Sequence, residues 1–479
     1  VVISDTGEVS ASLLNDLATA TTGDVTSTSV TAVTGTAAQV RAAVENAQLL
    51  SLGGVNVTLS GTASAADIEA ISALTSGTLT ATLSDGETAL NLAAATTSKN
   101  TIILNDDGVA VTGSGAVDEI TVGTGADTLN LGGGDDIVNI SGSGAANGDV
   151  INTEGGDDAI NISGDGTVVS TDNLTIDGGS TGETNGDVLT VSDTNDFTAS
   201  TISNVELEVR SDVTFTVDQI VAAGGAVKVA DDVAGDSNSH AITIVQGGAS
   251  ELTITSMDDI TSVTVAAGIT LTLSDEAAAD FAATALAQKD NGDVTTGLTL
   301  DASATVILSS AGRQLLIESS DGAPALIAAA DLNYTISDSA ANIVTALAAD
   351  AAFVTGSTGD FTVTGTAAAA ADMVQINAES TKLIDASSVV TYTGTSDDIV
   401  SVAQSAEITT AANYAATVVG LTSVAQANIL DANTTGVVSA TITEGGLAAL
   451  TTLTDVNGNN NLSVTVTDTS AAAADLNTV

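Results

Sequence analysis

A recurring pair of side chains, an Asp followed two positions later by an aliphatic residue, is the part of this sequence best suited to chemistry. The pair occurs five times between residues 113 and 161, at steps of nine residues apart from one step of thirteen. Calcium prefers hard oxygen ligands from carboxylates and backbone carbonyls, so the pattern predicts calcium sites. The acidic members are Asp118, Asp127, Asp136, Asp149 and Asp158.

Glycines at fixed places before the Asp explain how the pattern could hold an ion. The unit is the nonapeptide G-G-x-G-x-D-x-U-x, in which U is aliphatic. Glycine permits a tight turn that aims backbone carbonyls inward, and the Asp adds charge beside them. The candidate turn residues are Gly123, Gly125, Gly132, Gly134 and Gly155. A degenerate continuation of the pattern adds Asp177 and Asp187.

Alternate nonapeptides form turns on the same side of a parallel β-roll, so residues about eighteen apart should share an ion. Clustered carboxylates repel one another until an ion neutralises them, which couples binding to folding. We therefore expect chelation to loosen residues 113–190 before the rest of the chain. The alternation places Asp118, Asp136 and Asp158 in one row and Asp127 and Asp149 in another.

Before the nonapeptides, the chain repeats a longer unit of one strand, one turn and a short Ala-rich helix. Segments 33–44 and 59–71 show it most clearly, and further copies begin at Ile3 and Leu83. Ser, Thr or Asp after each strand can cap the helix that follows. The expected strand ends fall at residues 3, 33, 59, 83 and 104. Such self-similarity is typical of a solenoid.

The same unit returns after residue 190, with a less regular stretch from Phe197 to about Met257. We therefore predict a β-rich solenoid of stacked coils, each with one strand plus a short helix, interrupted by a calcium-binding parallel β-roll. Strand-to-helix junctions are expected after residues 273, 336, 363, 392, 442 and 466. The predicted segments are a strand-helix solenoid at 1–112, the β-roll at 113–190, an irregular β-rich connection at 191–260 and a second strand-helix solenoid at 261–479.

The composition limits the classes of partner. The chain of 479 residues has 60 acidic and 7 basic side chains, for a formal net charge of −53. Nucleic acid and anionic membrane surfaces need clustered Lys or Arg, and the basic residues here lie singly, so we expect neither as a partner. Hydrophobic residues make up 43% of the chain, which favours a folded protein over a disordered one. No apolar run has the length of a membrane span, so we expect no membrane insertion.

The side chains needed for most catalytic sites are scarce. Histidine occurs once, at His240, and there is no Cys. The His and Cys residues that Ser-His triads, zinc sites and thiol chemistry need as bases, ligands or nucleophiles are therefore scarce or missing. Paired carboxylates could cleave glycosidic bonds, but the three tyrosines are scattered and form no sugar platform. We therefore expect a protein that is not an enzyme. Asn139 and Asn161 match glycosylation sequons, although their place within the nonapeptides favours a role as ladder residues.

The nonapeptides resemble the RTX (hemolysin-type) calcium-binding repeats of proteins exported from Gram-negative bacteria. The resemblance covers residues 113–190, and the remaining Ala, Thr, Gly and Asp-biased coils resemble repetitive cyanobacterial surface proteins and RTX-bearing bacterial S-layer proteins. The resemblance implies secretion in an unfolded, calcium-free state and folding in the calcium of the extracellular medium. It thus implies an extracellular or cell-surface location and Ca²⁺ as the bound ion.

We expect a structural subunit of a calcium-stabilised extracellular assembly of a bacterium, either a surface layer or a filament. The alternative is a spacer or binding region of a large secreted RTX adhesin. The expected partners are further copies of the chain, in a polymer or lattice, with cell-surface polysaccharide as a second candidate. No polar capping repeat is visible at either end. Either the native chain continues beyond residue 479 or other subunits cover its ends.

Overall fold

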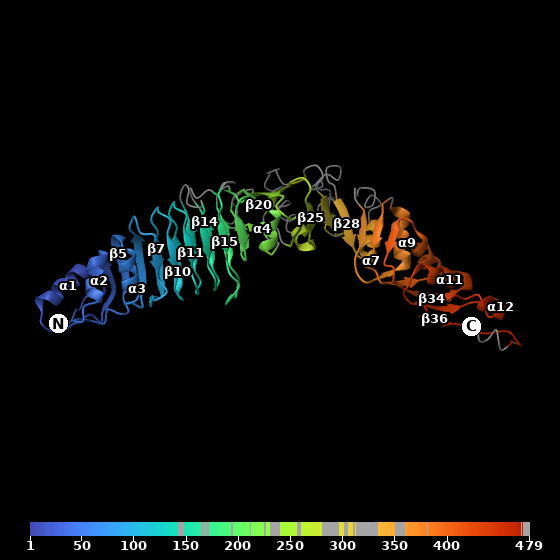
Figure 1. Cartoon of the computed structure of the whole chain (residues 1–479), viewed down its shortest axis with the longest axis horizontal. Coiled ribbons are helices and arrows are strands. Elements are labelled where there is room, and N and C mark those ends of the chain that lie inside the picture. Colours follow the sequence, from blue (N-terminus) through green and yellow to red (C-terminus); the bar gives the residue numbers. More distant parts are fainter. Residues whose placement is uncertain are drawn as a thin grey trace. The chain divides into compact units, whose positions relative to one another are not determined.

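The computed structural model contains mostly parallel β-sheets with few helices, arranged in a solenoid-like way (Figure 1). It forms two compact units, Val1–Ile269 with Ala283–Ala302, and Thr270–Ala282 with Ser303–Val479. The first unit therefore contains all of the predicted segments 1–112, 113–190 and 191–260. The structure describes residues 1–141, 148–163, 168, 172–192, 195–210, 212–224, 227–229, 240–255, 260–279, 297–300, 305–309, 312, 334–349, 360–380, 382–470 and 472.

The first coils of unit 1 combine one strand with one helix, as the sequence predicts. Thr36 accepts a hydrogen bond from the backbone N–H of Gln39, and Ser64 does the same for Asp67, so each begins a helix as its N-cap. Consecutive helices contact one another, and the strands before them pair in parallel. These elements are β1 (Gly7–Ser10), α1 (Ala11–Ala20), β3 (Val30–Gly35), α2 (Ala37–Val44), β5 (Asn56–Ala63) and α3 (Ala65–Ser72), with the short strands β2 (Val25–Thr26) and β4 (Leu49–Leu50) between them.

Two details of the predicted coils are wrong. The first strand is β1, which begins at Gly7 and buries Val9, rather than a strand that ends at Ile3. The copy that begins at Leu83 forms strand β7 (Ala89–Asn91) in place of a helix. A turn with Gly86 at φ +83° precedes β7, and only Leu90 of the three strand residues is buried. This copy lacks the apolar spacing of a helix and adds a strand to a second sheet instead.

From β7 to β18, each coil contributes one strand to each of two parallel sheets. The long sheet has eleven strands in the order β1-β3-β5-β6-β8-β10-β12-β14-β16-β19-β21, and the short sheet has six in the order β18-β15-β13-β11-β9-β7. The further strands of the long sheet are β6 (Thr78–Leu83), β8 (Lys99–Ile103), β10 (Val117–Thr121), β12 (Ile137–Ile140), β14 (Ala159–Ile162), β16 (Val188–Val191), β19 (Glu206–Val209) and β21 (Val227–Val229). Those of the short sheet are β9 (Ala110–Thr112), β11 (Thr128–Asn130), β13 (Val150–Asn152), β15 (Thr175–Asp177) and β18 (Thr201–Ser203).

The aliphatic residues of the nonapeptides form the core of these coils. Ile120, Val138 and Ile160 stack in register in the long sheet, and Leu129 and Ile151 stack in the short sheet. All five are fully buried. Since burying such a side chain stabilises a fold by about 1.5–3 kcal/mol, these two columns hold the coils together.

The described remainder of unit 1, which includes the predicted connection at 191–260, contains a further parallel sheet. Its parallel sheet has the order β17-β20-β22-β24-β26. The capping box of Thr216 and Gln219 begins the one helix described here, α4 (Val217–Ala222). The strands of this sheet are β17 (Asn195–Asp196), β20 (Val213–Thr216), β22 (His240–Val245), β24 (Ile260–Val265) and β26 (Gly297–Leu300), and β23 (Glu251–Ile254) follows β22.

Unit 2 returns to coils with helices. Parallel strands follow one another in the order β25-β27-β28-β29-β31-β33 in one sheet and β30-β32-β34-β35-β36 in another. The first sheet includes β25 (Thr270–Leu273), β27 (Thr305–Leu308), β28 (Tyr334–Asp338), β29 (Phe361–Val363), β31 (Ile384–Ala386) and β33 (Ile408–Thr410). The second consists of β30 (Ala367–Ala369), β32 (Thr391–Gly394), β34 (Ala415–Thr422), β35 (Val438–Ile442) and β36 (Asn461–Ser463). The helices are α7 (Ala340–Ala349), α9 (Ala370–Glu379), α10 (Ser396–Gln404), α11 (Val424–Asn433) and α12 (Leu447–Leu450). The expected helix after residue 466 falls largely outside the described residues.

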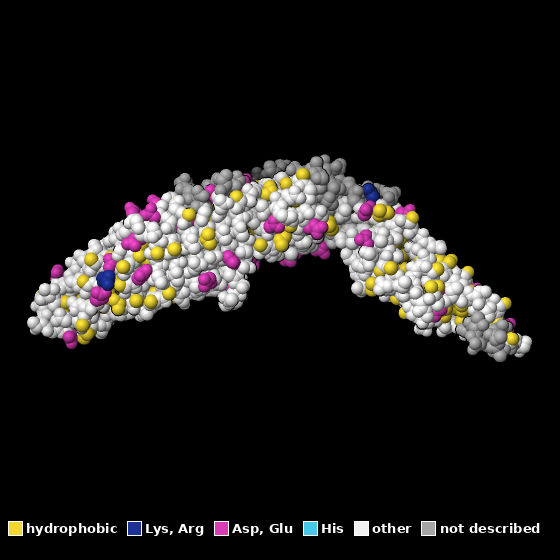
Figure 2. Space-filling view, viewed as in Figure 1, with side chains coloured by type: hydrophobic (Ala, Val, Ile, Leu, Met, Phe, Trp, Pro, Cys, Tyr) yellow, Lys and Arg dark blue, Asp and Glu magenta, His cyan; other side chains and the backbone are white. Residues whose placement is uncertain are grey.

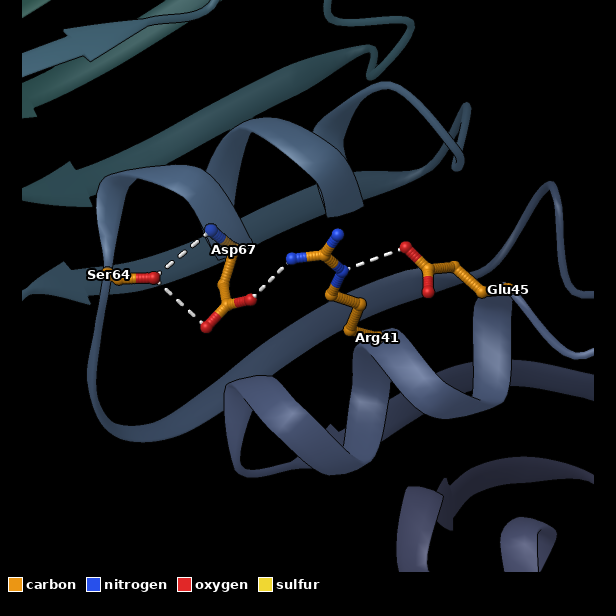
Figure 3. A network of polar contacts seen from close by, with 4 residues as sticks. All are labelled: Arg41, Glu45, Ser64 and Asp67. Atoms are coloured by element: carbon orange, nitrogen blue, oxygen red, sulfur yellow. Dashed lines mark hydrogen bonds and ion pairs between the residues drawn. The ribbon is translucent and has the colours of Figure 1, made fainter.

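The few basic side chains of the N-terminal coils join neighbouring coils. Arg41 of α2 contacts Glu45 through Nε at 2.8 Å and Asp67 of α3 through Nη1 at 2.9 Å (Figure 3). Lys99 Nζ lies 2.8 Å from Glu119 Oε2 on the next strand. Acidic side chains are spread over the face drawn in Figure 2, whereas basic ones are sparse. Among the helices that the structure describes, none combines the length and the apolar character of a membrane span.

Candidate cation site

The acidic residues of the nonapeptides form a buried ladder along the long sheet. The backbone N–H of Asp118 donates to Asp136 Oδ1 at 2.8 Å, that of Asp136 to Asp158 Oδ1 at 2.7 Å, and that of Asp158 to Asp187 Oδ1 at 2.8 Å. At its first rung, Asn100 donates through Nδ2 to Asp118 Oδ1 at 2.7 Å. The four carboxylates are at most 2% exposed. We call Asp118, Asp136, Asp158 and Asp187 the long Asp ladder.

A second ladder follows the short sheet. The N–H of Val109 donates to Asp127 Oδ1, and the N–H of Asp127 donates to Asp149 Oδ1, both at 2.8 Å. Asp127 and Asp149, the short Asp ladder, are fully buried. Strands β13 and β15 pair Val150 with Thr175, so the place that follows Asp149 in register is that of Leu174. The two rows predicted from the alternation of the nonapeptides therefore lie on separate sheets.

The spacing of Asp and aliphatic residue explains this burial. Side chains alternate between the faces of a strand, so residues two apart point the same way. Ile160 is a core residue, and Asp158 must therefore also point inward. The carboxylate enters the interior at the point where the turn meets the strand, and there Oδ1 accepts the backbone N–H of the preceding coil.

Most of these carboxylates keep one oxygen without a hydrogen-bond partner. Among the described residues, Oδ2 of Asp136, Asp149, Asp158 and Asp187 is buried and accepts no hydrogen bond. Leaving a charged oxygen buried without a partner is costly, because it loses its water without compensation. A bound cation or bound protons would therefore stabilise these buried carboxylates.

The burial of these groups raises their pKa values. Desolvation raises the pKa of Asp136 to about 8 and that of Asp149 to about 7, with repulsion from neighbouring carboxylates adding to it. Desolvation also raises the pKa of Asp127 and of Asp187 to about 6. The pKa values of Asp118 and Asp158 are raised for the same reason. The anionic form is thus disfavoured at most positions of both ladders.

Glycines allow the turns of successive coils to approach closely. A Cβ on Gly123 would lie 1.7 Å from the carbonyl oxygen of Asn105, and one on Gly156 would lie 1.9 Å from that of Gly134. Similar close approaches occur at Gly125, Gly132, Gly134 and Gly155. Gly156 also has φ +133°, a conformation that L residues rarely adopt. A side chain at these places would push the turns apart.

We expect Gly156→Ala to destabilise the protein by at least about 3 kcal/mol, because the new Cβ clashes with backbone and strains φ. Urea unfolding followed by circular dichroism measures the change. Gly115→Ala is the matched control, because a Cβ there would meet no atom within 4 Å. Equal losses of stability in the two variants would contradict the close approach of the turns.

The structure separates the predicted site residues into two groups. The six ladder carboxylates and the five candidate glycines gather in the stacked turns described above. Asp177 does not join them: it ends β15, is partly exposed, and pairs in register with Asn152. Its Oδ1 accepts hydrogen bonds from Gly179 N–H and Asn204 Nδ2.

Several residues of the site were not among the sequence candidates. Asn100 continues the long Asp ladder, and Gly156 makes a closer turn contact than Gly155. Ser114 donates to Asp118 through both its N–H and its hydroxyl. The interval of eighteen residues between Asn100 and Asp118 could have identified Asn100, since it equals that between Asp118 and Asp136.

The donor set fits a hard cation that accepts backbone oxygens. In the described part of the chain, no group of three or more His, Asp or Glu side chains could by itself hold a metal ion. A cation would therefore need one or two carboxylate oxygens together with turn carbonyls, a combination that calcium accepts. Zinc, which favours nitrogen and sulfur ligands, does not suit these all-oxygen turns.

Comparisons with known proteins return no relative: no family model, no curated protein and no solved structure matches this chain.

Proposed function

We propose that the protein is a calcium-stabilised structural protein whose two-sheet coils form an RTX-type β-roll. The observation that supports this most directly is the row of buried carboxylates in glycine turns, four of which have an oxygen without a hydrogen-bond partner among the described residues. Asp136, Asp149, Asp158 and Asp187 would supply these oxygens to Ca²⁺, with backbone carbonyls of the turns completing the ligands. The ion would supply positive charge where the fold buries negative charge.

The position of the ladder supports a structural role in preference to a catalytic one. Strands β10, β12, β14 and β16 lie in the middle of the eleven-stranded long sheet, with helix-bearing coils before them. Ions in these turns would join strands of one continuous sheet. Calcium binding would then contribute to the folding free energy of the coils, because Asp136, Asp149, Asp158 and Asp187 are costly to bury as anions without it.

The proposed setting is extracellular, at the surface of a bacterium, where calcium is abundant enough to fill such sites. The long parallel sheets and the acidic surface suit a subunit of a surface layer or filament, in which calcium can also reduce repulsion between copies. Outward side chains form polar ladders: Asn161 Nδ2 donates to Asn139 Oδ1 at 3.2 Å and Asn152 Nδ2 to Asn130 Oδ1 at 2.9 Å. The two sequon asparagines thus lie in a side-chain ladder, and further copies of the chain are the proposed partners.

Electron microscopy of the purified chain tests this assembly. With millimolar calcium we expect sheets or fibres, and with excess EGTA we expect dispersed particles. Magnesium at the same concentration is the control for simple screening of charge. Isolated particles in calcium would contradict the assembly and favour the alternative, a spacer or binding region of a secreted RTX adhesin.

A further inference from the structure

The six ladder carboxylates differ in what their second oxygen contacts. Oδ2 of Asp118 accepts the Ser114 N–H at 2.7 Å and the Ser114 hydroxyl at 3.1 Å. Oδ2 of Asp127 accepts the Gly123 N–H at 3.1 Å. The remaining four ladder residues have no donor to Oδ2 among the described residues, although each is at most 2% exposed.

The backbone of the turns differs between the first two ladder residues, Asp118 and Asp127, and the later residues Asp136 and Asp158. In the first two turns, the residue four positions before the Asp directs its N–H onto the carboxylate. In the turns of Asp136 and Asp158, the residue at that place has positive φ: +98° at Gly132 and +74° at Glu154. The residues two positions before the Asp, Gly134 and Gly156, are also positive, at +125° and +133°.

In the turns of Asp136 and Asp158, backbone N–H groups donate to carbonyl oxygens of the next coil. Gly134 N–H donates to Gly155 O at 3.0 Å, and Gly156 N–H donates to Thr181 O at 3.2 Å. These two N–H groups stand two positions before the Asp and join neighbouring coils. Oδ2 of Asp136 and of Asp158 receives no N–H from its own turn. Oδ2 of Asp149 and of Asp187 is likewise buried without a donor, so all four residues would gain from an external positive charge.

The first members of both ladders need no ion. Asp118 is held by Asn100 Nδ2 on Oδ1 and by two donors of Ser114 on Oδ2, so its carboxylate has three hydrogen bonds. Asp127 has one backbone donor on each oxygen. These donors offset part of the cost of burying the two carboxylates.

Building on the proposed function, we infer that calcium binds at Asp136, Asp149, Asp158 and Asp187 only, and that Asp118 and Asp127 are structural residues that begin each ladder. The nonapeptide pattern alone assigns all of these residues to ions. If hydrogen bonding divides the residues in this way, the roll binds fewer ions than the nonapeptide pattern alone predicts. These ions lie in the later coils of the roll.

Calorimetric titration of the full chain with calcium chloride tests the division. We expect Asp118→Asn and Asp127→Asn to bind as many ions as the unsubstituted chain, and Asp136→Asn and Asp158→Asn each to bind about one fewer. Circular dichroism in calcium checks that each variant folds. Should Asp118→Asn not fold, Ser114→Ala replaces it: this change removes one donor to Oδ2 and should leave the number of ions unchanged.

The possible results distinguish a failure of this division of the ladder residues from a failure of the proposed calcium binding. If Asp118→Asn loses an ion as Asp136→Asn does, the division is wrong while calcium binding stands. If the unsubstituted chain binds no calcium at millimolar concentration, the proposed function is itself contradicted, and the division with it. Equal ion counts in the unsubstituted chain and Asp136→Asn would also overturn the division.

Discussion

Replacement of Asp136 by Asn is expected to stabilise the protein in EGTA and to weaken its response to calcium. The Asn side chain keeps an oxygen to accept the Asp118 N–H, as Asp136 Oδ1 does now. It removes a buried charge whose pKa is raised to about 8. Since one pKa unit is worth about 1.4 kcal/mol and buried charges cost several kcal/mol, we expect a gain on the order of 3 kcal/mol at pH 8 without calcium.

In calcium, the same substitution should lose most of this advantage, so that the variant and the unsubstituted chain have similar stability. A ligand that binds only the folded state at a hundred times its Kd stabilises by about 2.7 kcal/mol per site, and the Asp136→Asn variant would lose that contribution. Melting curves in EGTA and in calcium measure both effects. Asp135→Asn is the matched control, because Asp135 is exposed and accepts only the Asp157 N–H among the described contacts. Lower stability of Asp136→Asn in both conditions would contradict the account.

The calcium-free protein is expected to gain stability as the pH falls from 8 to 5. In the folded state, burial raises the pKa values of four ladder carboxylates to between about 6 and about 8. These are Asp127, Asp136, Asp149 and Asp187. The folded state therefore binds protons more tightly than the unfolded chain, in which Asp titrates near its ordinary value. The stabilisation is fully present below that ordinary value and is lost as the pH rises through the folded-state pKa values.

This pH window separates the ladders from the rest of the acidic surface. A carboxyl group with the ordinary pKa of about 4 changes its charge below this window and contributes little between pH 5 and 8. We expect the midpoint of urea unfolding in EGTA to rise steadily over this range, and Asp136→Asn to flatten the dependence. In saturating calcium the rise should vanish, because protons and calcium compete for the same oxygens. If the urea midpoint in EGTA instead decreased as the pH was lowered from 8 to 5, the ladders would not carry the buried charge.

The nonapeptide period was sufficient to predict which carboxylates share a row. Equal steps keep successive residues in register, and the alternation of strand side chains sends Asp and its aliphatic partner inward together. That is why Asp118, Asp136 and Asp158 could be placed in one row from their spacing. The helices after Thr36 and Ser64 were predictable for a similarly local reason, a capping residue followed by apolar spacing.

Register after an irregular interval could not be predicted in this way. The coil that follows Asp149 brings Leu174, and not Asp177, beside it, because spacing no longer fixes register once coil length changes. In the turns of Asp136 and Asp158, the missing hydrogen bond to Oδ2 accompanies a positive φ four residues earlier. Residue type does not reveal that sign, since Glu154 has φ +74° in the place that Gly132 occupies in the preceding turn of that row.

Hydrogen exchange of the full chain in calcium and in excess EGTA tests whether calcium holds the two-sheet coils together. We expect chelation to remove protection from backbone amides in β10 to β16, within residues 113–191, while β3 and β5 of the N-terminal coils and β34 and β35 of unit 2 keep theirs. Identical exchange of β10 to β16 in the two conditions would contradict it.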